Sequence, residues 1–540
     1  MKPIKQVESD QEDIPAVHWA DKAADELIKK HGNRKIVCAS GISPSGMVHI
    51  GNFREVITAE LVVRALRDRK SEVRFLYSWD DFDALRKVPA NLPNPELIEQ
   101  NLRRPLARIP DPYGRDESYA RHFERLFEEE IQQLGIHPEF IYQNIPYRNG
   151  TYADGIRFAL KNEKQIREIL NRSRTEPLPE NWTCLTVFCS SCEKDTTKIL
   201  QYDPPNSVKY FCRDCKKEST LDLDKDPGAK LLWRVDWPMR WNQENVDFEP
   251  GGKDHSSQGG SYDTGSEIIR EVWKKEPPSY TQYDFVIAKG LGAKLSSSSG
   301  NLITVSEALE VYEPTLIRWI FASRKPNIDF SIAFDLDVMK AYDDFDRCER
   351  FAYGIEPGEP KKVTYERRIY EFSLIQSRST GEYGPIPAQF PFRHLCNLLQ
   401  IHGGDFEATR LMVSDEIKTE LDAARFMSRA SRAWQWITRH APDAFRFAVR
   451  KPTDVIAKTK FPDAVQSLVT ALQDSKVSSF SEEALAQLIY QVMKDHALSA
   501  KDFFPEIYQI LIAKNQGPKL ASFLKAIGLP KAVELLAKAI

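Results

Sequence analysis

Residues 41–52 read GISPSGMVHIGN and directly follow the apolar run KIVCAS. The chain leaves a predicted strand through this turn and places His49 and Asn52 where a helical pattern begins. In a parallel sheet, such a strand-to-helix turn lies at the carboxyl edge, where these folds bind ligands. His49 and Asn52 share one face of the first helical turn, and Gly51 between them leaves room for a flat ring. The stretch therefore predicts a phosphate-binding turn, whereas a structurally satisfied histidine is the alternative.

The surrounding sequence predicts the sheet to which this turn belongs. A strand at KIVCASG (35–41), a helix at FREVITAELVVRALRDRK (53–70) and a strand at EVRFLYSWD (72–80) form a βαβ unit. Sheet-like sequence resumes at KLLWRVDWPMRW (230–241) and YTQYDFVIAKG (280–290), and helical periodicity dominates beyond about residue 335. We expect an α/β fold with a doubly wound, parallel, Rossmann-type sheet, interrupted by a long insertion and followed by an all-helical domain.

Composition limits the class of protein. The 540 residues are 41% hydrophobic and 28% charged, and no apolar run approaches the length of a membrane span. The N-terminus has no apolar signal core, so we expect a cytoplasmic protein without membrane contact. The net charge of −3 means that nucleic-acid contact requires local basic surface. Basic stretches at 101–108, 366–372 and 445–451 are candidates, although such runs are usually solvated helix faces.

Five of the eight cysteines fall between positions 184 and 215. Four of them form two C-x2-C pairs separated by nineteen residues: Cys189, Cys192, Cys212 and Cys215. This spacing is typical of tetrahedral zinc bound by four thiolates, with no position left for substrate. A disulfide is disfavoured in the cytosol, and a redox C-x-x-C motif needs no second copy. We predict a structural zinc ion in a small ribbon, with Cys184 outside it.

Two motifs resemble those of a known enzyme class. HIGN is similar to the HIGH motif of class I aminoacyl-tRNA synthetases, and KLSSSSGN (294–301) is similar to their KMSKS motif. Together with SWDDFDALRKVP, WRVDWPMRW and FEPGGKDHSSQGGSYDTG, they resemble the class I lysyl-tRNA synthetase family over residues 15–340 and more loosely beyond. The resemblance implies ATP-dependent activation of L-lysine and its transfer to tRNA(Lys), with Mg²⁺ accompanying ATP.

The resemblance also implies site residues. Those for catalysis and ATP binding are His49, Gly51, Asn52, Lys294, Ser296, Ser297 and Ser298. Those for lysine binding are Gly41, Ser43, Asp80, Trp233, His255 and Tyr283. The residues themselves leave two roles for Asp80, which either supplies negative charge to the pocket or caps the next helix. Ser297 stands where KMSKS has its second lysine, so Lys294 should carry an unusually large share of the charge stabilisation.

Residue patterns and resemblance together give a predicted domain order. It comprises a flexible N-terminus (1–20), the first half of the Rossmann catalytic domain (21–100), a connective insertion with the zinc ribbon (101–230), the second catalytic half with the KMSKS-like loop (231–300), a stem-contact or linker region (301–360) and a helical, helix-cage anticodon-binding domain (361–540).

Several other functions compete with this one. A class I synthetase for glutamate needs a cationic pocket, and one for cysteine needs a zinc ion that touches the substrate, which a closed four-cysteine site cannot provide. A small-molecule adenylyltransferase with this fold is usually shorter and lacks the zinc insertion. The serine-substituted loop leaves open a catalytically weakened, RNA-binding relative.

Overall fold

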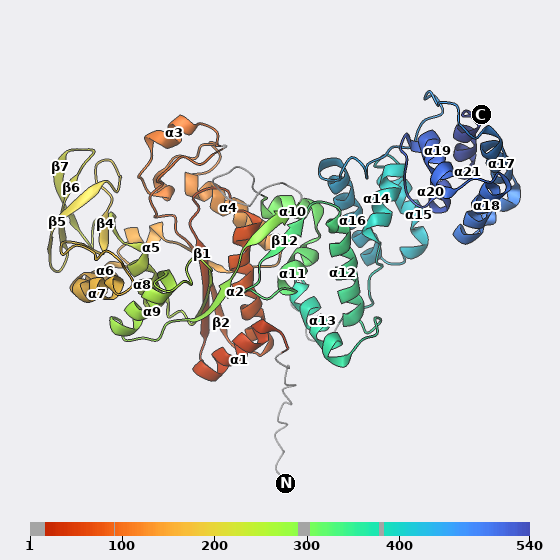
Figure 1. Ribbon diagram of the computed structural model, residues 1–540. Helices are drawn as coiled ribbons and strands as arrows, with labels where there is room; N and C mark the ends of the chain where they lie inside the picture. The colour runs from red at the N-terminus through yellow and green to blue at the C-terminus, as the bar shows by residue number, and fades with distance from the viewer. Residues whose placement is uncertain (1–16, 91, 290–302, 377–382) are drawn as a thin grey trace, which may run out of the picture. The chain divides into compact units, whose positions relative to one another are not determined.

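The computed structural model describes residues 17–90, 92–289, 303–376 and 383–540, and divides into two compact units (Figure 1). Unit 1 contains the chain up to residue 308 together with 314–332 and 348–383. Unit 2 contains residues 309–313, 333–347 and 384–540. Most of the N-terminus predicted to be flexible, and residues 294–298 of the second motif, lie outside the described residues. We describe each unit by itself.

A five-stranded parallel sheet forms the centre of unit 1. Its strands are β1 (Ile36–Ile42), β2 (Val73–Trp79), β3 (Glu139–Tyr142), β9 (Phe248–Gly252) and β10 (Ser279–Tyr283). Their order is β10-β9-β1-β2-β3, and all neighbouring pairs are parallel. The order reverses between β1 and β9, which confirms the predicted doubly wound sheet and places its ligand-binding crevice at the ends of these two strands.

Helix α2 (Ile50–Asp68) packs against the sheet and is buried on every face, although it carries charged side chains among its apolar ones. Residues Phe53 to Leu66 of this helix are buried, and it contacts β1, β2, β9 and α1. The other helices of unit 1 are α1 (Trp19–His31), α3 (Pro95–Gln100), α4 (Tyr119–Gln133), α5 (Asn144–Arg148), α6 (Ala153–Lys161), α7 (Glu163–Asn171), α8 (Trp233–Glu244), α9 (Ser261–Glu271), α11 (Pro314–Ala322) and α13 (Pro360–Ser373). Strands β11 (Val286–Lys289) and β12 (Phe330–Ala333) pair separately.

The expectation of sheet structure at 230–241 is wrong for most of that segment. Only β8 (Ala229–Leu231) is a strand, and α8 begins at Trp233. Tryptophan and valine favour strands, but tertiary packing overrides that preference. The spacing of Trp233, Trp237 and Trp241 is four residues, so the three rings lie on one helix face. Trp233 stacks on Trp237 with their centroids 5.0 Å apart.

The cysteine-containing insertion has its own small sheets. β4 (Leu185–Val187) pairs antiparallel with β8, and β5 (Thr197–Asp203), β6 (Ser207–Cys212) and β7 (Lys217–Asp222) form a three-stranded antiparallel ribbon. The side chains of Val208, Tyr210 and Leu221 are buried in the core that the ribbon shares with α6 and α7. The ribbon therefore joins the body of unit 1 through a continuous apolar core.

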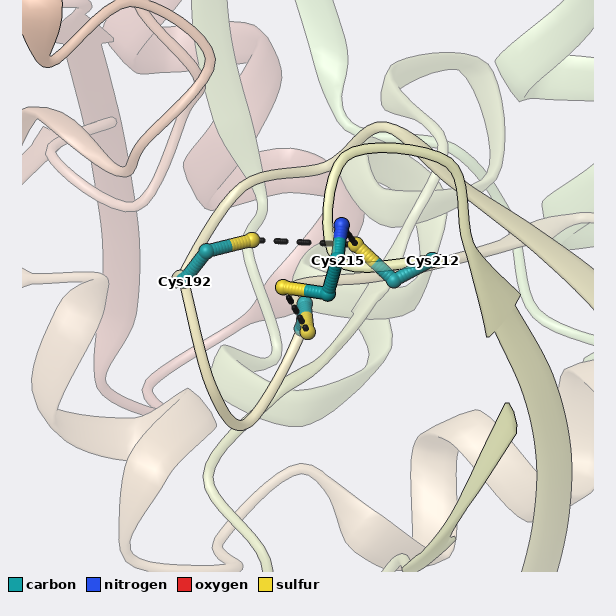
Figure 2. Close-up of side chains that lie close together, drawn as sticks. Cys192, Cys212 and Cys215 are labelled. Atoms are coloured by element: carbon teal, nitrogen blue, oxygen red, sulfur yellow. Dashed lines mark hydrogen bonds between the residues drawn. The ribbon is translucent and has the colours of Figure 1, made fainter. Parts of the chain in front are cut away.

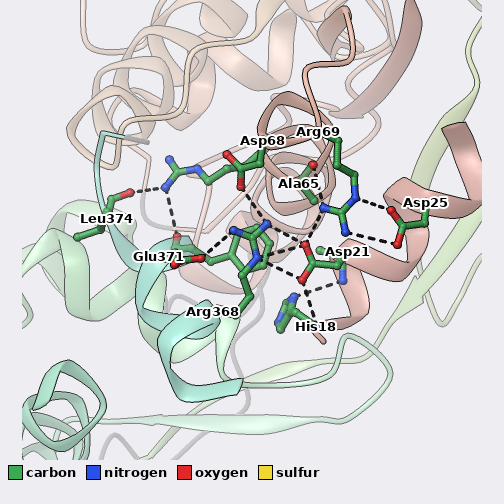
Figure 3. A network of polar contacts seen from close by, with 12 residues as sticks. His18, Asp21, Asp25, Ala65, Asp68, Arg69, Arg368, Glu371 and Leu374 are labelled. Atoms are coloured by element: carbon green, nitrogen blue, oxygen red, sulfur yellow. Dashed lines mark hydrogen bonds and ion pairs between the residues drawn. The ribbon is translucent and has the colours of Figure 1, made fainter. Parts of the chain in front are cut away.

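A buried ionic network ties the start of the chain to α2 and α13 (Figure 3). Asp21 pairs with Arg69 at 2.9 Å and with Arg368 at 2.8 Å, and Arg368 also pairs with Asp68. Burial lowers the pKa of the neighbouring His18 to about 4, so this ring caps α1 as a neutral acceptor. Arg368 belongs to the basic stretch 366–372, and its charge is used inside the protein rather than on a phosphate-binding surface.

Unit 2 is built mainly from helices. They are α14 (Phe392–Ile401), α15 (Phe406–Met412), α16 (Glu420–Arg439), α17 (Pro462–Leu472), α18 (Glu482–Asp495), α19 (Ala500–Ile512), α20 (Leu520–Ile527) and α21 (Leu529–Ala537). Two further helices, α10 (Val305–Val311) and α12 (Asp337–Ala352), each begin in one unit and end in the other. Among the described residues, no helix has the length and apolar character needed to cross a membrane.

Candidate active site

A cavity of about 450 Å³ lies at the carboxyl ends of β1 and β9, where the strand order reverses. Its walls come from β1, the start of α2, the end of β2, α8, and the residues that follow β9 and β10. Nine residues predicted from the sequence line it: Gly41, Ser43, His49, Gly51, Asn52, Asp80, Trp233, His255 and Tyr283. Segments separated by more than two hundred residues thus meet at one crevice, as the Rossmann topology requires.

The HIGN turn caps the helix that follows it. The Nδ1 atom of His49 accepts hydrogen bonds from the backbone N–H groups of Gly51 (3.0 Å) and Asn52 (3.3 Å). The side-chain oxygen of Asn52 accepts from the backbone N–H of His49 (3.3 Å), which completes a capping box. Burial lowers the pKa of His49 to about 4, so the ring is neutral and carries its proton on Nε2. That N–H and the Asn52 amide remain as donors.

This capping bears on how the predicted phosphate-binding turn could bind an anion. The N-terminus of α2 does not offer free backbone N–H groups, because Gly51 and Asn52 donate to His49 and Ile50 donates to the carbonyl of Ile303 at 2.7 Å. An anion here is therefore bound by side chains. A Cβ at Gly51 would lie 2.8 Å from the His49 ring, so the absence of a side chain at this position makes room for the imidazole.

A buried carboxyl group, Glu55, lines the cavity one helical turn beyond Asn52. Glu55 is only 5% exposed and accepts hydrogen bonds from the Tyr283 hydroxyl and the backbone N–H of Gly41. Burial, with a further contribution from the charge of Glu249, raises the pKa of Glu55 well above its ordinary value. A raised pKa makes this carboxyl group easier to protonate, and a cation bound beside it would favour the ionised form. Sequence reasoning missed this residue.

Glu249 of β9 is a second buried carboxyl group in the cavity wall. It accepts a hydrogen bond of 2.6 Å from the indole N–H of Trp241, and burial raises its pKa to about 7. An acidic residue inside a strand that is buried throughout is costly unless the residue is paired or functional, but the sequence contained no sign that residues 248–252 form such a strand. Glu249 was also absent from the predicted site.

Asp80 lines the cavity, but its charge is balanced. Its carboxylate pairs with Arg240 at 2.6 Å, and this buried guanidinium also donates to Ser78. The alternative role for Asp80, capping the next helix, is wrong, because α3 begins at Pro95 after Asn94. Asp83, three residues further along the chain than Asp80, also lines the cavity.

Aromatic rings form one side of the cavity. Trp233 is 36% exposed, stacks on Trp237 and lies 6.2 Å from the His255 ring between centroids. Trp237 also lines the cavity and lies 5.9 Å from His255 between ring centroids, so it belongs to the wall. An indole face beside buried carboxyl groups suits an alkyl chain that ends in a cation.

The predicted second motif cannot be placed, because Lys294, Ser296, Ser297 and Ser298 lie outside the described residues. The described residues on either side of it are at the cavity. Val286 and Ile287 of β11 line the cavity, and Thr304 forms an isolated β-bridge with His49.

The four predicted metal ligands come together in the insertion (Figure 2). The sulfur atoms of Cys189 and Cys215 are 3.9 Å apart and those of Cys192 and Cys212 are 3.7 Å apart. Four Zn–S bonds of 2.3 Å in tetrahedral geometry give sulfur separations of about 3.8 Å. The observed distances match this value and far exceed the length of a disulfide bond. The cluster can therefore hold a tetrahedral metal ion.

A larger cavity, of about 630 Å³, lies in unit 2. Arginine, lysine and histidine side chains line it: Arg393, His394, Arg446, Lys514 and Lys519. The rings of Phe445, Phe447 and Phe523 also line it, and Glu482 is the one acidic residue among the described residues of its walls. Arg446 belongs to the basic stretch 445–451. This cavity is suited to an anionic ligand with an apolar face, and it has no part in the site at the sheet.

Comparison with known proteins identifies the class of this chain. Residues 17–376 match the family model described as tRNA synthetases class I (K). A lysine–tRNA ligase from Treponema pallidum is 42% identical over 95% of this chain and 97% of its own length. A lysine–tRNA ligase from Borrelia garinii is 43% identical over 97% of this chain and 100% of its own length. One from Pyrococcus horikoshii is 40% identical over 95% of this chain and 97% of its own length. The chain is therefore a class I tRNA synthetase. It belongs to the class I (K) family.

Proposed function

We propose that the protein is a lysine–tRNA ligase that activates L-lysine with ATP and transfers the lysyl group to tRNA(Lys). The observation that carries this proposal is a single cavity that joins the HIGN turn to buried carboxyl groups and an indole wall. The relatives described above are lysine–tRNA ligases, and each is 40–43% identical to this chain over nearly its whole length.

The charge of the cavity favours lysine over glutamate. Six of its lining side chains are carboxyl groups and one is a lysine. In this proposal the ammonium of the substrate pairs with Glu55 while its alkyl chain lies against Trp233. The predicted residues Gly41, Ser43, Asp80, His255 and Tyr283 surround the rest of the amino acid. A glutamate side chain placed against Glu55 would meet a carboxyl group instead of a cation, so it would gain no ion pair there.

One assay separates the candidate functions. ATP–pyrophosphate exchange should be measured with each amino acid, with and without tRNA, alongside aminoacylation of tRNA(Lys). We expect lysine to support exchange far better than any other amino acid. Faster exchange with another amino acid would refute the lysine assignment, and no exchange under any condition would favour the RNA-binding relative.

The activation step needs alignment rather than a general base, because the lysine carboxylate is already ionised at neutral pH. It attacks the α-phosphorus of ATP while charge builds on the departing pyrophosphate, which is bound with Mg²⁺ as part of the substrate. The Nε2–H of His49 and the amide of Asn52 are donors suited to that charge. Lys294 and Ser296–Ser298 are proposed to complete the phosphate site.

Replacing His49 with asparagine should separate catalysis from folding. Asparagine is a good N-cap and keeps an acceptor for the helix, but it lacks the Nε2 donor. Losing one hydrogen bond to a charged group should slow lysine-dependent exchange about 10- to 100-fold. The urea midpoint should stay close to that of the wild type. The control is His137→Asn on an exposed histidine, and equal activity of the two variants would contradict the role of His49.

The four-cysteine cluster is proposed to hold one structural zinc ion. Freshly purified protein should contain about one zinc per chain by elemental mass spectrometry, as a closed Cys₄ site requires. Cys212→Ser should lose this metal. Cys184→Ala should retain it, because the buried Cys184 is not one of the four residues that the structure brings together. Metal-free wild-type protein would contradict the assignment.

Unit 2 is proposed to contact tRNA and to serve as the predicted anticodon-binding domain. Its cavity offers basic side chains for phosphate and phenylalanine rings for an unstacked base. The basic stretch 445–451 contributes Arg446 to this surface. The earlier segment 361–383 packs in unit 1, so the proposed tRNA-binding helices are those from α14 onward.

A further inference from the structure

The loop that follows the first cysteine pair carries two acidic side chains that are anchored outside the ribbon. Glu193 forms ion pairs with Arg104 and, at 2.8 Å, with Arg108. Asp195 pairs with Arg103 at 2.7 Å, and the backbone N–H of Asp195 donates to the carbonyl of Arg103 at 2.9 Å. Three arginines of the basic stretch 101–108 are thus committed to this loop, which corrects their interpretation as a phosphate-binding surface.

The geometry of the loop depends on the cysteines. The backbone N–H of Glu193 donates to the carbonyl of Cys189 at 2.8 Å, and that of Cys189 donates to the carbonyl of Lys194 at 2.9 Å. Glu193 has a φ of 58°, in the left-handed region, directly after Cys192. The same tight turn therefore sets the positions of two metal-ligating sulfurs and of the Glu193 carboxylate.

The arginine segment in turn supports one wall of the substrate cavity. Arg103 donates its backbone N–H to Leu85 (2.7 Å), Leu85 donates to Arg104 (3.1 Å) and Leu106 donates to Asp83 (2.9 Å). Ala84 and Pro105 form an antiparallel bridge within this ladder. Because Asp83 lines the cavity, only this short ladder separates the cysteine loop from the substrate site.

A second connection runs through the base of the ribbon. β4, which leads to Cys189, pairs with β8, which leads to Trp233. The backbone N–H of Leu232 donates to the carbonyl of Cys184 at 2.8 Å, and Lys230 of β8 pairs with Asp83. The acidic wall and the indole wall of the cavity are therefore both fastened to the segment that carries the first cysteine pair.

We propose that metal binding by the four cysteines positions these walls, with Glu193, Asp195 and their arginine partners as positioning residues. The metal site and the substrate cavity are then coupled, although no metal ligand touches substrate. Thermodynamic coupling is reciprocal, so a ligand that binds better to the positioned walls also raises the affinity of the cysteines for the metal. We expect this higher affinity to appear as slower release of the metal. The zinc ion and the choice of lysine as that ligand both rest on the proposed function.

The test compares Glu193→Gln/Asp195→Asn with Glu218→Gln, a control on β7 that removes an exposed carboxylate paired with Lys209. All cysteines remain in both variants. Zinc-loaded proteins are mixed with a chromogenic chelator, and the rate of zinc release is followed with and without lysine and ATP. We expect release from the double variant to be about tenfold faster than from the control, a usual size for coupled sites.

Amide hydrogen exchange supplies a readout that does not depend on activity. Removing zinc from the wild-type protein should raise exchange in residues 81–107, and the double variant should show the same increase with zinc bound. Unchanged exchange there, with changes confined to 184–222, would overturn the proposal, as would equal zinc release from the two variants. Both measurements keep their meaning if lysine proves not to be the substrate.

Discussion

Replacing Glu55 with glutamine should raise the KM for lysine about 30- to 1,000-fold, the effect of removing roughly 2–4 kcal/mol by truncating a buried charge pair. Glutamine has the same shape and can still bond with Tyr283, but it cannot become an anion when the ammonium enters. ATP–pyrophosphate exchange at varied lysine concentration measures the change. The KM for ATP should vary little, because His49 and Asn52 are untouched.

The pH dependence of the same variant gives an independent signature. In the empty protein the pKa of Glu55 is raised, so the carboxyl group keeps its proton at pH values where an ordinary glutamate has lost it. Binding of an ammonium favours the carboxylate and therefore releases a proton. The KM for lysine should fall as pH rises toward the raised pKa of Glu55. In Glu55→Gln most of this slope should vanish, leaving the part due to Glu249.

The control is Glu72→Gln, which removes a glutamate that is 69% exposed and paired only at the surface with Lys35. Its kinetics should match those of the wild type at every pH. If Glu55→Gln had the lysine KM and pH profile of this control, the ammonium would have to bind elsewhere, and Glu249 would be the next candidate.

The sequence predicted the class of the sheet, its strands β1, β2 and β10, and the location of the site, because these depend on local patterns. It did not predict β3 or β9. Strand, turn and helix follow one another between residues 35 and 80, and the rules for parallel sheets place the turn at the ligand-binding edge. Once the sheet has formed, the predicted residues from His49 to Tyr283 lie around one cavity. Trp233, Trp237 and Trp241 also carried a helical signal in their spacing, which the strand preference of their neighbours obscured.

Asp80 on the acidic side of the cavity was predicted, but Glu55 was not, because α2 is buried on every face and has no polar stripe. Glu55 and Glu60 lie on this one helix, yet Glu55 lines the cavity while Glu60 pairs with Arg318, 258 residues further along the chain. One local difference is that Arg64, four residues after Glu60, pairs with it at 3.0 Å, whereas Ala59 stands four residues after Glu55. Their roles depend on distant partners, and the same limitation applies to the buried ion pairs of unit 2.

Replacing Arg429 with methionine should destabilise unit 2 by about 3–5 kcal/mol, the usual cost of leaving buried charges unpaired. The Arg429 side chain on α16 is fully buried and pairs with Glu313 at 3.1 Å and Asp346 at 2.8 Å, both only 7% exposed. It also donates to the carbonyl of Phe390 at 2.9 Å. Methionine fills much of the volume but removes the guanidinium that pairs with both carboxylates.

Hydrogen exchange in α14 and α16, together with urea unfolding followed by circular dichroism, measures this loss. The matched control on the same helix is Arg439→Met, because Arg439 is 53% exposed and its ion pair with Glu310 lies at the surface. Such pairs contribute at most about 1 kcal/mol. Exchange in α2 should not change in either variant if the two compact units unfold separately. Similar destabilisation by the two substitutions would show that burial of the ion pair does not determine the stability of unit 2.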